Sequence, residues 1–313
     1  MTDERREFLV EVAWLHHDYH LTQEEIARRF GVSRSTVSRA LADAERLGIV
    51  QVVVTEPLRR ESRLAADMAV HLGIAAAVGV RVGDEPPRHA AARAAARLVE
   101  RIADAGHATI AVSWGRTLAA TAGLVRPRST SGIVVVDAVG HAAGAGMTPA
   151  VEVTRGLAAA LGATMVHLPA PAFVAAGPSH DALATTQPVR RALNIARSAD
   201  VTLVSIGLAG RASLLLEDGL LDTAAVDDLL EAGAIGEILG RWFNAEGLEV
   251  DVPDVAAVGL SLADLRASRR VIGVAGGAEK APAILAALAG GIVGELVVDD
   301  GLAEALLAGP SLR

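Results

Sequence analysis

The sequence predicts an α/β protein of two parts, a winged helix-turn-helix domain followed by a larger domain built around a parallel β-sheet. Length is the first observation, because 313 residues correspond to about two domains. Composition is the second, because the chain is 51% hydrophobic but only 3% aromatic, as expected for buried aliphatic strands. The third is a change from short helical patterns to strand-like runs that alternate with helical stretches. We therefore expect domains at residues 1–56 and 63–313, joined at 57–62 by a linker, with a turn into a connecting helix as the alternative.

Residues 23–42 have the spacing of a helix-turn-helix, with Gly31 allowing the left-handed turn between two helices. Thr22 can cap the first helix with Glu25 as its capping-box partner, and Ser33 can cap the second. Apolar side chains on both helices would pack the pair together: Ile26, Ala27, Val32, Val37 and Ala40. The pattern predicts the second helix as the one that reads DNA.

A local DNA-binding surface is also favoured by the distribution of charge. The chain has a net charge of -8, which argues against a protein that coats nucleic acid over its whole surface. Residues 28–46, however, carry five Arg against two acidic residues, a net charge of +3. Exposed hydroxyls and amides hold phosphates, while Arg can donate twice to guanine. The predicted DNA-binding residues are Thr22, Gln23, Ser33, Arg34, Ser35, Thr36, Ser38 and Arg39.

A wing strand at residues 49–55 would flank this surface. The alternative interpretation of the whole region is a structural helical hairpin with a solvated, serine-rich face. Since one helix-turn-helix module binds DNA weakly, the DNA-binding form should be an oligomer.

Strand-like runs and helical stretches alternate through the second part of the chain. The runs are 76–82, 109–113, 133–138, 201–206, 255–260, 271–275 and 295–298. This alternation predicts one parallel sheet covered on both faces by helices, with a ligand site in the turns at the carboxyl ends of the strands. In the helical stretch 89–105, Arg93, Arg97 and Arg101 recur every four residues, which predicts a solvated arginine row rather than an anion-binding strip.

Two of these turns have the residues of an anion site. After the run ending at residue 112, the sequence Ser113-Trp114-Gly115-Arg116-Thr117 leads into a helix, and the free amides of a helix start favour phosphate. The turn 275–280 also follows a strand and contains Lys280, the only lysine among 29 basic residues. The alternative for the first turn is an ordinary βα turn, and the alternative for the second is a lysine retained by chance.

Composition excludes several other kinds of site. The chain has no cysteine, which excludes disulfides, thiolate metal sites and cysteine nucleophiles. The charged start and the interrupted apolar runs predict neither a signal peptide nor a membrane span, so we expect a cytoplasmic protein without a membrane partner. His16, His17, Asp18 and His20 are interpreted as a polar helix end, and no metal or cofactor is expected.

The motifs QEEIARRFGVSRSTVSRAL, SWGRT, SIG, GAIGEI, RWFNAEG and AGGAEKAPAILAAL together resemble the SorC family of sugar-responsive bacterial transcription regulators, in the family's order and over nearly the whole chain. The resemblance implies a winged-helix DNA-binding domain and a Rossmann-like effector domain related to phosphosugar isomerases. It also implies a tetramer, with a dimer as the alternative, in which a phosphorylated sugar binds the large domain and changes operator affinity.

The resemblance assigns an effector site residue by residue. Its members would be Ser113, Gly115, Arg116, Thr117, Gly140, His141, Gly207, Glu237 and Lys280. The SWGRT turn would hold the phosphate, Glu237 would accept sugar hydroxyls and Lys280 would donate to the ligand. His141 stands where relatives often present a basic residue, and a merely exposed loop histidine is the alternative. Val151 and Asn244 stand where relatives frequently have Asn and Asp, so the particular sugar does not follow from the family.

Three hypotheses of function follow. The first is a DNA-binding regulator of carbohydrate metabolism genes, a repressor, in which a phosphosugar shifts the population between DNA-competent and incompetent assemblies. The second is a sugar-phosphate isomerase or deaminase with an added DNA-binding arm. Catalysis needs a positioned general base, and Glu237 is the only candidate within the motifs, so we predict no catalytic residue. The third is a DNA-binding oligomer whose large domain serves only assembly.

Overall fold

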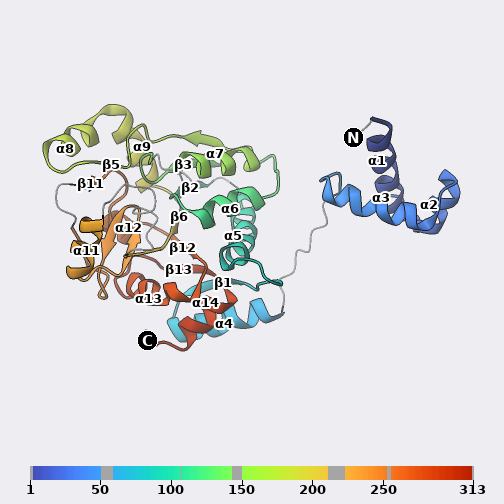
Figure 1. The fold of residues 1–313 in the computed structure, drawn as a ribbon. Helices are drawn as coiled ribbons and strands as arrows, with labels where there is room; N and C mark the ends of the chain where they lie inside the picture. Colours follow the sequence, from blue (N-terminus) through green and yellow to red (C-terminus); the bar gives the residue numbers. More distant parts are fainter. Residues whose placement is uncertain are drawn as a thin grey trace. The chain divides into compact units, whose positions relative to one another are not determined.

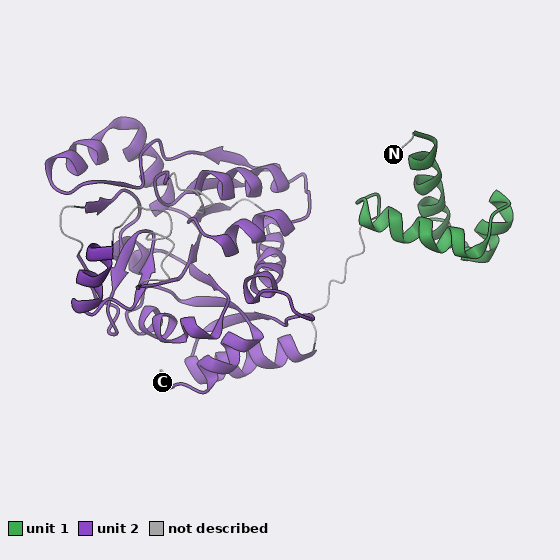
Figure 2. Ribbon diagram, viewed as in Figure 1, with its two compact units in different colours: residues 1–57 green, residues 58–313 purple. Residues whose placement is uncertain are grey.

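The computed structural model describes residues 3–50, 59–106, 108–142, 150–210, 223–251 and 255–311. The chain divides into two compact units, residues 1–57 and residues 58–313 (Figures 1 and 2). No helix within the described ranges has both the length and the apolar character needed to cross a membrane.

Within the described residues, the first unit contains three helices around a small aliphatic core. They are α1 (Asp3–His17), α2 (Gln23–Phe30) and α3 (Arg34–Arg46). The core consists of Leu9, Val12, Ala13, Ile26, Ala27, Val37, Ala40, Leu41 and Ala44. Gly31 ends α2 in the left-handed conformation, with a φ of 64°. The helix-turn-helix prediction is therefore confirmed, and residues 51–55 of the expected wing lie outside the described residues.

Local hydrogen bonds at the two helix starts are those that the sequence predicts. The Thr22 hydroxyl accepts from the amide of Glu25, whose carboxylate accepts from the Thr22 amide at 2.8 Å. The Ser33 hydroxyl accepts from the Thr36 amide at 3.1 Å. These caps fix where each helix begins and thereby fix the exposed start of α3.

The second unit is built on a seven-stranded sheet whose neighbouring strands are all parallel, in the order β1-β13-β12-β6-β2-β3-β4. The strands are β1 (Ala75–Gly79), β2 (Thr109–Val112), β3 (Val134–Asp137), β4 (Thr164–Val166), β6 (Val201–Ser205), β12 (Val271–Ala275) and β13 (Glu295–Asp299). The carboxyl ends of β2, β6 and β12 are therefore adjacent, near the middle of the sheet.

Helices cover both faces of this sheet (Figure 1). One face packs against α5 (Pro87–Asp104), α6 (Arg116–Leu124) and α7 (Ala150–Leu161). The other face packs against α4 (Arg59–Leu72), α9 (Gln187–Arg197), α12 (Leu262–Ala267), α13 (Ala281–Ala289) and α14 (Asp300–Leu307). Alternation within β2 shows why both faces are buried, because Ile110 and Val112 enter the first core while Ala111 enters the second.

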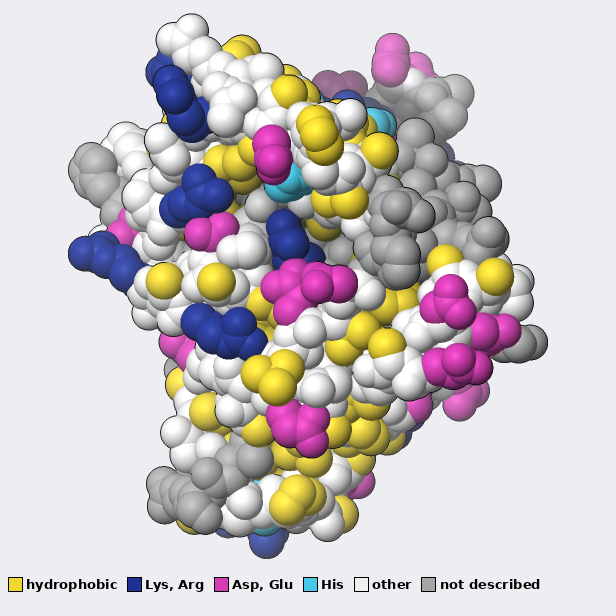
Figure 3. All heavy atoms as spheres, turned by 90° about the vertical axis from the view of Figure 1, so that its left-hand side faces the viewer, with side chains coloured by type: hydrophobic (Ala, Val, Ile, Leu, Met, Phe, Trp, Pro, Cys, Tyr) yellow, Lys and Arg dark blue, Asp and Glu magenta, His cyan; other side chains and the backbone are white. Residues whose placement is uncertain are grey.

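The described residues of the second unit also form two smaller sheets and three further helical segments. Strands β7 (Gly207–Leu208), β8 (Gly236–Ile238), β9 (Arg241–Phe243) and β10 (Glu249–Val250) form an antiparallel sheet, and β5 (Phe173–Ala175) pairs with β11 (Val255–Ala257). The other segments are α8 (Pro178–Thr185), α11 (Thr223–Glu231) and the 3-10 turn η1 (Ala278–Lys280). Acidic and basic side chains lie interspersed among hydrophobic ones on the face shown in Figure 3.

Three sequence expectations differ from the structure. The run 255–260 does not join the parallel sheet, because β11 pairs antiparallel with β5 outside it. The expected linker at 57–62 overlaps α4, which begins at Arg59. The arginine row of α5 is not simply solvated, because Arg93 pairs with Glu85 and Arg97 pairs with Glu61 at 3.0 Å. Glu85 lies in the loop before α5 and Glu61 lies on α4, so the helical spacing of the arginines alone gives no indication of these carboxylates.

Candidate functional site

The start of α3 presents donors and hydroxyls that the cap arrangement leaves outside the core. Arg34, Ser35, Ser38 and Arg39 are exposed, and Thr36 is half-buried. The Ser33 hydroxyl lies 2.8 Å from the hydroxyls of both Ser35 and Thr36. Neither Arg34 nor Arg39 forms an ion pair within the described residues. The Arg34 guanidinium is therefore available to phosphate or base edges, and so are the Nη groups of Arg39, whose Nε donates to the Ser35 carbonyl oxygen at 3.3 Å.

The beginning of α2 is more constrained than the start of α3. Thr22 is exposed, but its hydroxyl donates to Glu25 Oε2 at 2.7 Å as part of the capping box. Gln23 is half-buried at the first position of the helix. Thr22 can bind a DNA phosphate through its hydroxyl only if it exchanges this internal partner.

The SWGRT turn lies between β2 and α6. Ser113 is fully buried, and its hydroxyl donates to the Trp114 carbonyl oxygen at 3.2 Å, so that hydroxyl is engaged inside the protein. Gly115 has a φ of 128°, and a Cβ at this position would lie 2.4 Å from Ser205 Oγ. Only glycine fits here. The first amides of α6 follow, including that of the buried Thr117, and such amides have no partner within the helix.

Ser205 ends β6 and is the first residue of the SIG motif. Its Oγ is buried and has no hydrogen-bond partner within the described part of the chain. A buried hydroxyl without a partner is uncommon, and a bound ligand is one of the groups that can satisfy it. Its position against Gly115 places it at the turn expected to hold phosphate.

Glu237 is a buried carboxyl group on β8, 7% exposed, opposite Gly207 on β7. A Cβ at position 207 would lie 2.9 Å from Glu237 Oε2, so glycine gives this carboxylate its space. Burial raises the pKa of Glu237 to about 7, although the Gly240 amide, which donates to Oε1, and the charge of Lys280 both oppose the rise. The group therefore changes its protonation near neutral pH.

Lys280 reaches toward the same place from η1. Its Nζ donates to the Ile206 carbonyl oxygen at 2.9 Å. Burial lowers the pKa of Lys280, Arg116 lowers it further, and Glu279 and Glu237 act in the opposite direction. Arg116 and Glu237 are thus both close enough to Lys280 to affect its charge. Arg116 itself is exposed and has no ion pair within the described residues.

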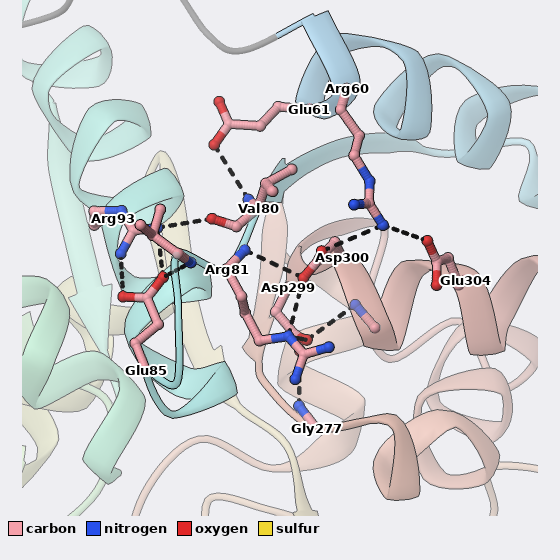
Figure 4. A network of polar contacts seen from close by, with 12 residues as sticks. Arg60, Glu61, Val80, Arg81, Glu85, Arg93, Gly277, Asp299, Asp300 and Glu304 are labelled. Atoms are coloured by element: carbon pink, nitrogen blue, oxygen red, sulfur yellow. Dashed lines mark hydrogen bonds and ion pairs between the residues drawn. The ribbon is translucent and has the colours of Figure 1, made fainter.

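A network of buried carboxylates holds the turn that carries Lys280 (Figure 4). Asp299, 1% exposed, accepts from the Gly277 amide at 2.8 Å. Its neighbour Asp300 accepts from Arg81 Nε at 3.2 Å and lies 3.5 Å from Arg60 Nη2. Because Arg60 belongs to α4, this network links the turn to the first helix of the second unit.

Two predicted members of the effector site, Gly140 and His141, follow β3, the neighbour of the strand β2 that leads into the SWGRT turn. The amide of His141 donates to the Ala170 carbonyl oxygen at 2.7 Å, and its ring lines a hollow of about 630 Å³. Gly140 is needed for packing, since a Cβ there would lie 2.3 Å from the Pro171 carbonyl oxygen. No hydrogen bond or ion pair between described residues joins His141 to Glu237, Lys280 or the SWGRT turn.

The two positions where the sequence departs from relatives have local roles. Asn244 Oδ1 accepts from the amides of Glu246 and Leu248 at 3.1 and 2.9 Å, so its side chain shapes the turn between β9 and β10. Val151 is half-buried in the first turn of α7.

A histidine and an aspartate that the sequence analysis did not pair lie together at the edge of the sheet. His167 Nδ1 is 2.5 Å from Oδ2 of Asp137, which is 1% exposed. Asp137 ends β3 and His167 follows β4, and these strands are neighbours. The sequence does not indicate this pair, because the strand β4 that brings His167 beside Asp137 is too short to be recognised from its residues.

Comparisons with known proteins agree with both units. Residues 13–61 match the model of the MarR family, and residues 53–308 match a family model described as a putative sugar-binding domain. The fold and these matches define a DNA-binding transcription regulator with a sugar-binding domain.

Individual relatives cover nearly the whole chain. The sorbitol operon regulator of Klebsiella pneumoniae is 28% identical, over 96% of this chain and 97% of its own. The crystal structure of full-length SorC from the same organism has a TM-score of 0.77 and 28% identity, and the match covers 98% of this chain and 99% of that one. The erythritol catabolism regulatory protein EryD of Brucella abortus is 27% identical over 99% of each chain. This chain belongs to the SorC family of transcription regulators, as its motifs predict.

Proposed function

We propose that the protein represses carbohydrate metabolism genes and is controlled by a phosphorylated sugar. Residues 1–57 would bind operator DNA through the start of α3, and residues 58–313 would bind the effector and form a homo-oligomer. The relatives named above regulate sorbitol and erythritol genes, which supports a carbohydrate effector. An oligomer is proposed because a single helix-turn-helix unit binds weakly and needs a second half-site, and the resemblance to the SorC family favours a tetramer over a dimer.

One observation carries the effector proposal: Arg116, Lys280 and Glu237 converge at the carboxyl ends of β2, β6 and β12. A phosphate requires cations and free amides, which Arg116, Lys280 and the start of α6 supply. A sugar requires an acceptor for its hydroxyls, and the buried carboxyl of Glu237 is one. The ligand regulates DNA binding only if it has different affinities for the two assemblies.

Regulation rather than catalysis is favoured because the relatives are named as regulators. We propose that the bound sugar phosphate is not turned over and that no cofactor takes part. Incubation of the full chain with sugar phosphates, followed by product analysis, tests this directly. Stoichiometric recovery of the ligand is expected, and steady turnover would establish an enzyme.

The main experiment measures operator binding by fluorescence anisotropy, with DNA selected from a random pool by the protein itself. One or more phosphorylated sugars should weaken binding by roughly 5- to 150-fold, and their unphosphorylated forms should not. Arg116→Ala and Lys280→Ala should remove this response but retain DNA binding. Arg155→Ala is the matched control, because Arg155 is exposed on α7 and its one ion pair among the described residues is with Glu152 of the same helix.

The DNA surface is tested separately. Arg34→Ala should weaken operator binding, whereas Arg63→Ala, on α4, should not. Retained DNA binding with no response to any sugar phosphate would contradict the effector proposal. An unchanged response in Lys280→Ala would show that the ligand binds elsewhere.

A further inference from the structure

We propose that a polar relay, formed by Gly277, Asp299, Asp300 and Arg60, transmits effector binding toward the DNA-binding unit, with Arg60 and Asp300 as its positioning residues. This role rests on the proposed function, because it names the contacts through which the sugar phosphate changes operator affinity. The relay begins at the turn that carries Lys280 and ends at the first turn of α4 (Figure 4).

The turn that carries Lys280 is packed too tightly to move by itself. A Cβ at Gly276 would lie 2.6 Å from the Arg88 amide nitrogen, at the start of α5. The next residue, Gly277, donates its amide to Asp299 Oδ1 at 2.8 Å. Close-packed interiors transmit small displacements instead of absorbing them. A ligand that shifts Lys280 therefore shifts Asp299 as well.

Asp299 passes this displacement to the start of α14. Its Oδ2 accepts from the Gly301 amide at 3.1 Å, so both carboxylate oxygens are engaged and the side chain caps the helix. Asp300 is the first residue of α14 and is 5% exposed. Its Oδ1 accepts from Arg81 Nε at 3.2 Å, and its Oδ2 lies 3.5 Å from Arg60 Nη2. Because a buried carboxylate needs its cationic partners, a shift of Asp300 changes where Arg60 is held.

The first turn of α4 is the part of this helix that depends most on charge. Residues 59–62 contain no apolar side chain, and every apolar side chain that α4 buries follows them. Arg59 and Arg60 stand at the positive end of the helix dipole, where cations are unfavourable. Asp300 and Glu304 offset this, since Arg60 Nη2 also donates to Glu304 Oε1 at 2.6 Å. A turn with so few apolar contacts is released at small cost.

The first turn of α4 is also where the second unit begins. The chain reaches it from residues 1–57, which contain the DNA-binding helices. Glu61 fixes the turn to α5 through Arg97 at 3.0 Å, whereas Arg60 fixes it to α14. A change in the hold on Arg60 therefore acts on the segment that joins the two units. The ligand then favours the assembly whose relay fits its bound form, and operator affinity changes with it.

The test measures operator binding of the full chain by fluorescence anisotropy, with and without each member of a panel of hexose, pentose and alditol phosphates. The unmodified chain should show the response of roughly 5- to 150-fold, and in Arg60→Gln the ratio of the two operator Kd values should fall to about 1. Ligand affinity without DNA, measured by isothermal titration calorimetry, should change by less than about threefold in this variant, because Arg60 acts on the coupling and not on the ligand. Operator binding without ligand should be retained.

Two further variants make the test specific. Arg63→Gln is the matched control and should keep the full response, because Arg63 is exposed on the same helix and pairs with Asp67 of α4 at 3.8 Å. Asp300→Asn breaks the relay from the side of α14 and should lose the response like Arg60→Gln. Combining the two variants should add nothing further, because both act through one contact.

The outcomes separate the relay from the proposed function. A full response in Arg60→Gln would overturn the relay and leave the proposed function intact. Loss of ligand binding or of operator binding in Arg60→Gln would show a contact that only holds the fold, which also overturns the relay. If no sugar phosphate changes operator binding by the unmodified chain, the proposed function fails and the relay fails with it. Because Arg60 is exposed, Arg60→Gln tests the relay even if Asp300→Asn does not fold.

Discussion

Replacement of Glu237 by Gln should change how the stability of the protein depends on pH. Burial raises the pKa of Glu237 from 4.5 to about 7, so the folded protein holds this proton more tightly than the unfolded chain. The stabilisation is complete below pH 4.5 and is lost as the pH rises to about 7. For this change in pKa the loss amounts to about 3 kcal/mol. Gln has no proton to lose, so Glu237→Gln should not show it.

Urea unfolding of both proteins between pH 4 and pH 8 measures this effect. The free energy of unfolding of Glu237→Gln should rise relative to the unmodified protein by about 3 kcal/mol across that interval. Titrating groups that do not interact with Glu237 cancel in the difference between the two proteins. Glu246→Gln is the control for the loss of one carboxyl group, because Glu246 is exposed in the turn after β9. A flat difference curve for Glu237→Gln would refute the argument that burial sets the pKa of this group.

Three further predictions concern other parts of the chain. Gly115→Ala should lower the free energy of unfolding by about 1 to 3 kcal/mol and remove the sugar response, because its Cβ would meet Ser205 Oγ and its φ is 128°. Unchanged stability and an unchanged response would contradict this. Ser33→Ala removes the cap of α3, so thermal unfolding should show a loss of about 1 kcal/mol and operator binding should weaken. Burial opposes ionisation of Glu100, but Arg126 outweighs it and lowers the Glu100 pKa to about 2. The stabilisation from Glu100 is therefore present above pH 4.5 and lost as the pH falls toward 2, and Glu100→Gln should flatten acid unfolding in that interval.

Features that depend on residues close in sequence were predicted well. The capping residues, Gly31 and the apolar positions of the helix-turn-helix all act within one or two turns of helix, and the structure confirms them. Strand β4 has only the three residues Thr164–Val166, too few to show a pattern. Strand β11 has the composition of a core strand, but its place depends on pairing with β5, about 80 residues earlier.

Contacts between neighbouring strand ends explain why the candidate sites were only partly predictable. Asp137 ends β3 and holds His167, which follows the adjacent strand β4. Asp299 ends β13 and holds Gly277, which follows the adjacent strand β12 and precedes Lys280. In both places a buried aspartate at the end of one parallel strand fixes the turn that carries a neighbouring strand's basic residue. Strand order decides these pairs, and order in a parallel sheet does not follow the sequence. A motif can therefore indicate Lys280, whereas the carboxylate that positions its turn becomes evident only from the folded sheet.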